Sequence, residues 1–139
     1  MGWSQRVTEW LSPDVSIPAI GQGALALEGR ADDEFVRDLA GRLDHLPTRI
    51  AVIAERALLE RLEGGCQVPI AAHATIKGDT LSVVGLVAAV DGRRVVRDSI
   101  HGPVEEAHLL GVRLAERLLA QGGEEILKEI YEKGAGERD

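Results

Sequence analysis

The spacing of hydrophobic residues along the chain changes at about residue 68. Over residues 47–62 apolar side chains recur every three or four positions, which predicts an amphipathic helix. Over residues 70–76 they recur every second position, which predicts a strand with one buried face. The outer side of the helix carries four charged residues that we expect to be solvated: Glu55, Arg56, Glu60 and Arg61.

Two more strands and two more helices follow from the same pattern. Residues 81–90 are apolar on both faces, which favours a central strand, and Asp91-Gly92 predicts a hairpin into a third strand over 94–100. Helical spacing returns over 104–118 and again over 126–131, after a Gly-Gly pair that breaks the helix. The predicted fold class is therefore α+β: a three-stranded antiparallel sheet covered by helices, forming a domain over residues 46–139.

The first 45 residues have a different organisation. Residues 3–11 show helical spacing, residues 12–18 are rich in turns, and residues 24–28 read as a short strand. Asp32 or Asp33 can cap a further helix with an apolar stripe that ends at Leu43. A lone strand has no partner in this region and must join another sheet. We therefore expect residues 1–45 to be the remnant of preceding α/β domains and an interdomain link, with Met1 an internal methionine of a longer protein.

Composition narrows the function classes. There are 16 basic and 23 acidic residues, giving a net charge of −7, which argues against binding to nucleic acid or to an anionic membrane. The single cysteine excludes an intrachain disulfide and a cysteine zinc cluster, and the four histidines show no ligand spacing, so no metal site is expected. No apolar run approaches the roughly 20 residues of a membrane span. These features predict a soluble cytoplasmic protein.

The candidate chemistry is at the single cysteine, Cys66, in a loop between a helix and a strand. The simplest interpretation is a small buried hydrophobic residue. However, two glycines before it and Pro69 after it would present the sulfur at a loop tip. A helix C-terminus precedes Cys66 and does not favour a thiolate, so a permanent covalent attachment is better supported than fast thiol catalysis or a redox switch.

Gly21-Gln22-Gly23 leaves two interpretations open. The triplet is either a simple turn or a set of backbone amides that binds a ligand carboxylate at close range. The spacing alone does not decide between them.

Three segments together resemble a known family. They are 17–24 (Ile-Pro-Ala-Ile-Gly-Gln-Gly-Ala), 54–57 (Ala-Glu-Arg-Ala) and 62–70 (Leu-Glu-Gly-Gly-Cys-Gln-Val-Pro-Ile). In this order they are similar to the C-terminal part of hydroxymethylbilane synthase, also called porphobilinogen deaminase. The resemblance runs from end to end of this chain but covers less than half of the family's protein.

The resemblance implies a function and a set of site residues. In the family, a cysteine at the position of Cys66 forms a thioether to a dipyrromethane cofactor. That primer is extended by four porphobilinogen units with loss of ammonia, and hydrolysis releases hydroxymethylbilane. Gln22 and Gly23 match a segment that lines the cofactor cleft. Arg30 matches a basic residue that pairs with acetate or propionate groups.

The resemblance also implies what this chain lacks. The family's catalytic aspartate and most of its cofactor-binding cations lie in its first two domains, so no catalytic residue is expected here. We expect the chain alone to be inactive and to act with the missing N-terminal domains of the same protein. The sequence does not decide whether the isolated chain carries the primer on Cys66. The alternative function is a non-catalytic interaction module that docks through its sheet edge and N-terminal strand.

Overall fold

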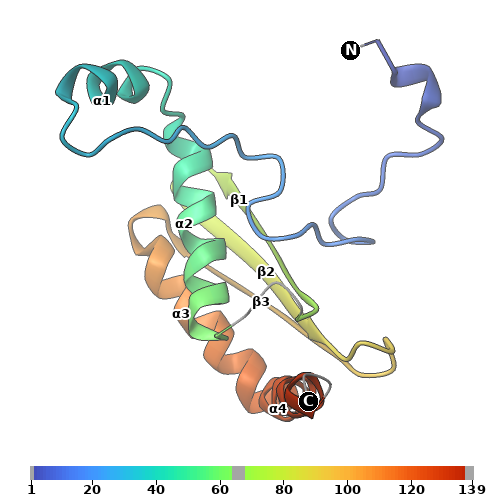
Figure 1. Ribbon diagram of the computed structural model, residues 1–139. Coiled ribbons are helices and arrows are strands. Elements are labelled where there is room, and N and C mark those ends of the chain that lie inside the picture. The colour runs from blue at the N-terminus through green and yellow to red at the C-terminus, as the bar shows by residue number, and fades with distance from the viewer. Residues whose placement is uncertain (1, 64–67, 137–139) are drawn as a thin grey trace.

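The computed structural model describes residues 2–63 and 68–136 and contains one antiparallel sheet (Figure 1). Its three strands are β1 (Ile70–Lys77), β2 (Thr80–Ala88) and β3 (Val95–Pro103), in the order β1-β2-β3. The predicted meander with a central second strand is confirmed. Gly92, at the tip of the second hairpin, has a φ of 70°, which a residue without a Cβ adopts at little cost.

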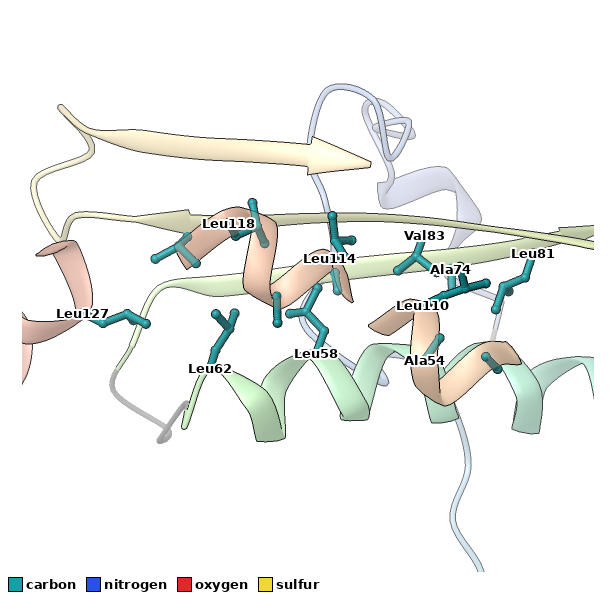
Figure 2. Close-up of a cluster of buried hydrophobic side chains, with 14 of the residues drawn as sticks. Ala54, Leu58, Leu62, Ala74, Leu81, Val83, Leu110, Leu114, Leu118 and Leu127 are labelled. Atoms are coloured by element: carbon teal, nitrogen blue, oxygen red, sulfur yellow. The ribbon is translucent and has the colours of Figure 1, made fainter. Parts of the chain in front are cut away.

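Two helices cover one face of the sheet, and a third lies at its end (Figure 1). α2 (Leu46–Arg61) and α3 (Ala107–Leu118) contribute the helical half of the core, whose leucines meet the inward side chains of β2 (Figure 2). The largest fully buried side chains are Leu58, Leu81, Leu110, Leu114, Leu118, Val83 and Val87. The core is aliphatic, and the predicted α+β fold class is confirmed.

A glycine allows α2 and α3 to pack closely where they cross. A Cβ on Gly111 would lie 2.2 Å from the carbonyl oxygen of Ala54. This contact sets the spacing of the two helices and therefore the position of α2 over the sheet.

The helix after β3 breaks at the predicted glycine pair. A short 3-10 turn, Val104–Glu106, leads into α3, and a π-helical turn over Leu119–Gly123 separates α3 from α4 (Glu124–Gly136). Gly122 has a φ of 107°, so the direction of the chain changes there. α4 thereby turns away from α3 toward the end of α2.

Asp98 fixes β3 to α3. Its carboxylate accepts hydrogen bonds from Arg117 Nη2 at 2.9 Å, Gln121 Nε2 at 2.8 Å and the Ser99 amide at 2.7 Å. Burial raises the pKa of this carboxyl, but the Ser99 and Gln121 hydrogen bonds and the Arg117 charge outweigh burial and hold the pKa below its ordinary value. The neighbouring side chain, Arg97, therefore projects from the opposite, helix-free face of the sheet.

The N-terminal region departs from two predictions. Residues 3–11 form only a 3-10 turn at Ser4–Arg6, and the expected strand over 24–28 is absent. Trp10 and Leu25 are 83% and 98% exposed, so neither segment packs on a core that could order it. The strand has no partner strand within the described residues, and without one its backbone hydrogen bonds cannot form. The N-terminal turn lies apart from the sheet (Figure 1).

The helix expected after residue 33 is present as α1 (Glu34–Gly41). Asp33, one of the two caps that the sequence allowed, accepts the Val36 amide at 3.0 Å through Oδ1, whereas Asp32 pairs with Arg30. The predicted apolar stripe is nevertheless largely exposed, with Val36 at 38%, Leu39 at 52% and Leu43 at 71%. α1 therefore forms from local signals and contacts the coil before it, whereas no helix or strand of the described chain packs extensively on it.

Residues 14–21 cross the helix-free side of the sheet, and we call them the crossing segment. At one end Arg97 of β3 donates to the carbonyl of Asp14 at 3.0 Å. At the other end the amide of Gly21 donates to Glu55 of α2, beside β1. Ile20 packs against the main core. The crossing segment is thus attached to both sides of the domain that follows it in sequence.

Candidate functional site

Cys66 lies outside the described residues, and the described chain on either side of it is hydrogen-bonded to other elements. On the first side, the Glu63 carbonyl accepts a hydrogen bond from the hydroxyl of Tyr131 on α4 at 2.5 Å. On the second side, the Pro69 carbonyl accepts the Ala88 amide of β2 at 2.9 Å. The segment that contains Cys66 therefore starts from a carbonyl held by α4 and ends at a carbonyl held by the sheet.

Gly21-Gln22-Gly23 forms two successive tight turns. The Gln22 amide donates to the Ala19 carbonyl at 3.0 Å, and the Ala24 amide donates to the Gly21 carbonyl at 3.1 Å. Gly21 and Gly23 have φ values of 67° and 82°, which favour glycine. The Gln22 side chain folds back, and its Oε1 accepts the Ala19 amide at 2.9 Å. The side-chain oxygen of Gln22 thus stabilises the turn.

Glu55 holds this turn against the sheet and is the residue that the sequence pattern misplaced. Its side chain is buried, with 6% of the residue exposed. Oε2 accepts the amide of Gly21 and Oε1 accepts the amide of Ala74, both at 2.8 Å. The prediction that Glu55 lies on a solvated face is therefore wrong, whereas Arg56, Glu60 and Arg61 are exposed as predicted.

The physical reason is that α2 contacts the crossing segment as well as the sheet. Ala74 belongs to β1, an edge strand, and its amide faces away from β2 toward α2. A buried amide at a sheet edge needs an acceptor, and the carboxylate supplies one. The sequence offered one signal for the burial of Glu55, though not for its two amide partners, because Glu55 precedes Leu58 by three positions and so lies at the edge of the apolar stripe.

His73 lies close to the same carboxylate without a tight contact. Its Nδ1 is 3.9 Å from Glu55 Oε1, and about a third of its side chain is exposed. The two backbone amides are therefore the close partners of Glu55, and His73 is a neighbour at the solvent side.

Arg30 is separate from the turn. Its Nε and Nη2 donate to Asp32 at 3.0 and 2.7 Å, and both side chains are largely exposed. The Arg30 hydrogen bond holds the pKa of Asp32 below its ordinary value. Arg30 lines a cavity of about 400 Å³ against α1, which Gln22 and Gly23 do not line. The structure brings Gln22 and Gly23 together but does not bring Arg30 to them.

A larger groove opens beside the turn. It has a volume of about 840 Å³ and lies between residues 21–27, α1 and the first half of α2. Gly23 lines it together with three cations that the sequence analysis did not assign to a site: Arg37, Arg49 and Arg56. Arg49 is paired with Asp44 at 3.1 Å, whereas Arg37 and Arg56 have no acidic partner among the residues described here. Guanidinium groups in a groove suit carboxylate ligands.

Within residues 2–63 and 68–136, none of the helices combines the length and the apolar character that a membrane span requires. No group of three or more His, Cys, Asp or Glu side chains there is arranged to hold a metal ion.

Comparison with known proteins gives two matches to family models. Residues 49–120 match the model described as "Porphobilinogen deaminase, C-terminal domain". Residues 1–38 match the model described as "Porphobilinogen deaminase, dipyromethane cofactor binding domain". The second description confirms dipyrromethane as the cofactor expected from the resemblance.

Individual relatives agree with the models. The chain is 55% identical over 133 residues to the porphobilinogen deaminase of Geobacter metallireducens, which covers 96% of this chain and 42% of that protein. It is 45% identical over 130 residues to the porphobilinogen deaminase of Carboxydothermus hydrogenoformans, and this match covers 94% of this chain and 42% of that protein. The chain therefore spans less than half the length of these relatives.

Proposed function

The chain belongs to the porphobilinogen deaminase family, and on that premise we propose that it is the C-terminal part of such an enzyme, with Cys66 as the anchor of its primer. The whole enzyme would join four porphobilinogen units to the primer with loss of ammonia and release hydroxymethylbilane. The observation that carries the role of Cys66 is its place in the Glu-Gly-Gly-Cys-Gln-Val-Pro segment, which lies inside the match to the C-terminal domain model. The hydrogen bonds of Glu63 and Pro69 hold the described chain on the two sides of this segment to α4 and β2.

The described residues suit a ligand that carries several carboxylates. The dipyrromethane primer, when bound, supplies acetate and propionate groups and the pyrrole carbon to which substrate is added. Gly23 and the guanidinium groups of Arg37 and Arg56 line one groove, where they would bind carboxylates. Gln22 would act by stabilising the turn that presents Gly23.

Arg30 would bind a carboxylate by exchanging its partner. Its present partner, Asp32, is 70% exposed, and ion pairs as exposed as this one are weak because water screens both charges. A ligand carboxylate could therefore replace Asp32 at little cost. We place Arg30 as a cofactor-binding residue of the complete enzyme.

The isolated chain is proposed to be inactive. It spans 42% of the length of the Geobacter metallireducens relative. The resemblance implies that the family's catalytic aspartate lies in the domains that this chain does not match. The first 45 residues would complete the preceding domains, and the rest of the same protein would be their partner. Turnover of porphobilinogen by the purified 139-residue chain would overturn this part of the proposal.

The test of the anchor is the mass of the complete enzyme and of its Cys66→Ser variant. We expect a covalent adduct on the wild-type protein, mapped to the peptide that contains Cys66, and none on the variant. The Glu60→Gln variant is the control, because Glu60 is an exposed residue of α2. An adduct that persists in Cys66→Ser, or an unmodified Cys66 in the active enzyme, would contradict the proposal. An unmodified thiol with tight binding of another protein would support the interaction module instead.

A further inference from the structure

We propose that Glu55 is a positioning residue, which sets the Gly21-Gln22-Gly23 turn against the domain that carries Cys66. The inference rests on the proposed function, in which the turn and Cys66 both bind the same primer. Its structural part, the contact of one carboxylate with two distant backbone amides, stands independently of the cofactor.

Glu55 connects the two elements that flank the Cys66 segment. α2, which holds Glu55, ends at Arg61 and leads into the Cys66 segment. β1, which begins at Ile70, receives the chain after that segment, and its Ala74 amide donates to Glu55. The second oxygen of the same carboxylate holds Gly21, which is 34 residues away in sequence. One side chain therefore joins the element before Cys66, the element after it and the turn.

The contact requires a carboxylate of this length. Both partners are N–H donors, and an ionised glutamate offers two acceptor oxygens and no donor. A glutamine at this position would present one NH2 group to one of the two amides, so one hydrogen bond would be lost. An aspartate carries the same two oxygens, but its side chain is shorter by one carbon–carbon bond, about 1.5 Å, so its carboxylate would fall short of the amides. Glutamate is therefore the side chain that satisfies both amides at once.

The consequence for the site is the relative placement of two groups. The Gly21 amide is fixed by Glu55, so the following residues, Gln22 and Gly23, keep a constant position relative to α2. Arg56, the next residue on α2, lines the same groove as Gly23. Loss of the Gly21 contact would let the turn move relative to this cation while leaving the sheet intact. We therefore expect an effect on the rate of the complete enzyme without loss of the attached primer.

The structural test uses amide hydrogen exchange in the 139-residue chain, measured residue by residue by NMR. In Glu55→Gln we expect exchange at Gly21 or Ala74 to become about tenfold faster, with β3 amides unchanged. Glu60→Gln, on the exposed side of the same helix, should leave both amides as in the wild type. Unchanged exchange at both amides would overturn the inference, as would equal acceleration in β3, which indicates general unfolding.

A second measurement needs no variant. In the wild-type chain, the amide nitrogens of Gly21 and Ala74 should each show a through-hydrogen-bond coupling to the carboxylate carbon of Glu55. Absence of both couplings would overturn the proposed contact even if Glu55→Gln failed to fold.

The functional test uses the complete enzyme that contains this chain. We expect Glu55→Gln to keep the Cys66 adduct and to lose about tenfold in kcat, while Glu60→Gln keeps wild-type kcat. Wild-type kcat in Glu55→Gln would overturn the positioning role. If wild-type protein carries no adduct on Cys66, the proposed function fails, and the exchange measurement still decides whether Glu55 holds the turn.

Discussion

Replacing Gly111 with alanine tests how closely α2 and α3 must pack. The new Cβ would lie 2.2 Å from the Ala54 carbonyl oxygen and 2.9 Å from the Ala57 Cβ. Ordinary carbon–oxygen contacts are about 3.3 Å or longer, so the helices would have to separate by about 1 Å. The nearest atom belongs to the backbone and cannot move aside as a side chain would.

The separation has a cost that can be estimated. Forcing a methyl group into a packed interface costs about 1–3 kcal/mol, and a backbone clash of this size points to the upper end. The higher helix propensity of alanine returns about 1 kcal/mol. We therefore expect Gly111→Ala to lower the free energy of unfolding by about 2 kcal/mol, and Tm by roughly 6 °C for a chain of this size.

The assay is urea and thermal unfolding followed by circular dichroism. Gly41→Ala is the matched control, because Gly41 ends α1 and a Cβ there meets no atom within 4 Å. The same substitution should therefore be neutral or stabilise by up to about 1 kcal/mol. Wild-type stability in Gly111→Ala would refute the argument that this glycine sets the spacing of the helices.

Three other substitutions test separate parts of the fold. Asp98→Asn should destabilise by about 2 kcal/mol at pH 7 by removing the charge that Arg117 contacts. Because the pKa of Asp98 is lowered in the folded state, its ionised carboxylate stabilises the fold at pH values above 3.8, and this stabilisation is lost as the pH falls further. In urea titrations, the stability difference between wild type and Asp98→Asn should therefore shrink below about pH 4. A difference that does not depend on pH would contradict this reasoning. Leu114→Ala, at a fully buried core position, should cost about 2–5 kcal/mol in urea unfolding, and a loss under 1 kcal/mol would contradict the packing. Asp33→Ala should remove the cap that accepts the Val36 amide and lower α1 helicity by circular dichroism, whereas Asp33→Asn should retain most of it.

The sequence predicted the elements whose formation depends on local signals. The change from helical to alternating spacing located α2 and β1, and Asp91-Gly92 located the second hairpin. Asp33 and the Gly122-Gly123 pair marked the start of α1 and the break before α4. Each of these signals acts within a few residues, so no knowledge of distant contacts was needed.

Local signals gave wrong predictions for two segments that need a packing or pairing partner. The spacing over residues 3–11 and the apolar run over 24–28 resemble regular elements, but the described chain offers them neither a core nor a neighbouring strand. The motif around Cys66 indicated the family from sequence alone. The attachment of its ends to Tyr131 and Ala88 depends on α4 and β2, which lie far from it in sequence.

Glu55 shows most clearly what only the tertiary structure decided. By its chemistry a glutamate on a helix is expected to face water, and the sequence gives no sign of the two amides that require it. Those amides come from residues 34 positions before it and 19 positions after it, and only folding brings them to one carboxylate. Hydrophobic periodicity therefore determined the elements and their order, whereas the satisfaction of buried polar groups, which depends on the whole fold, decided how the turn is held.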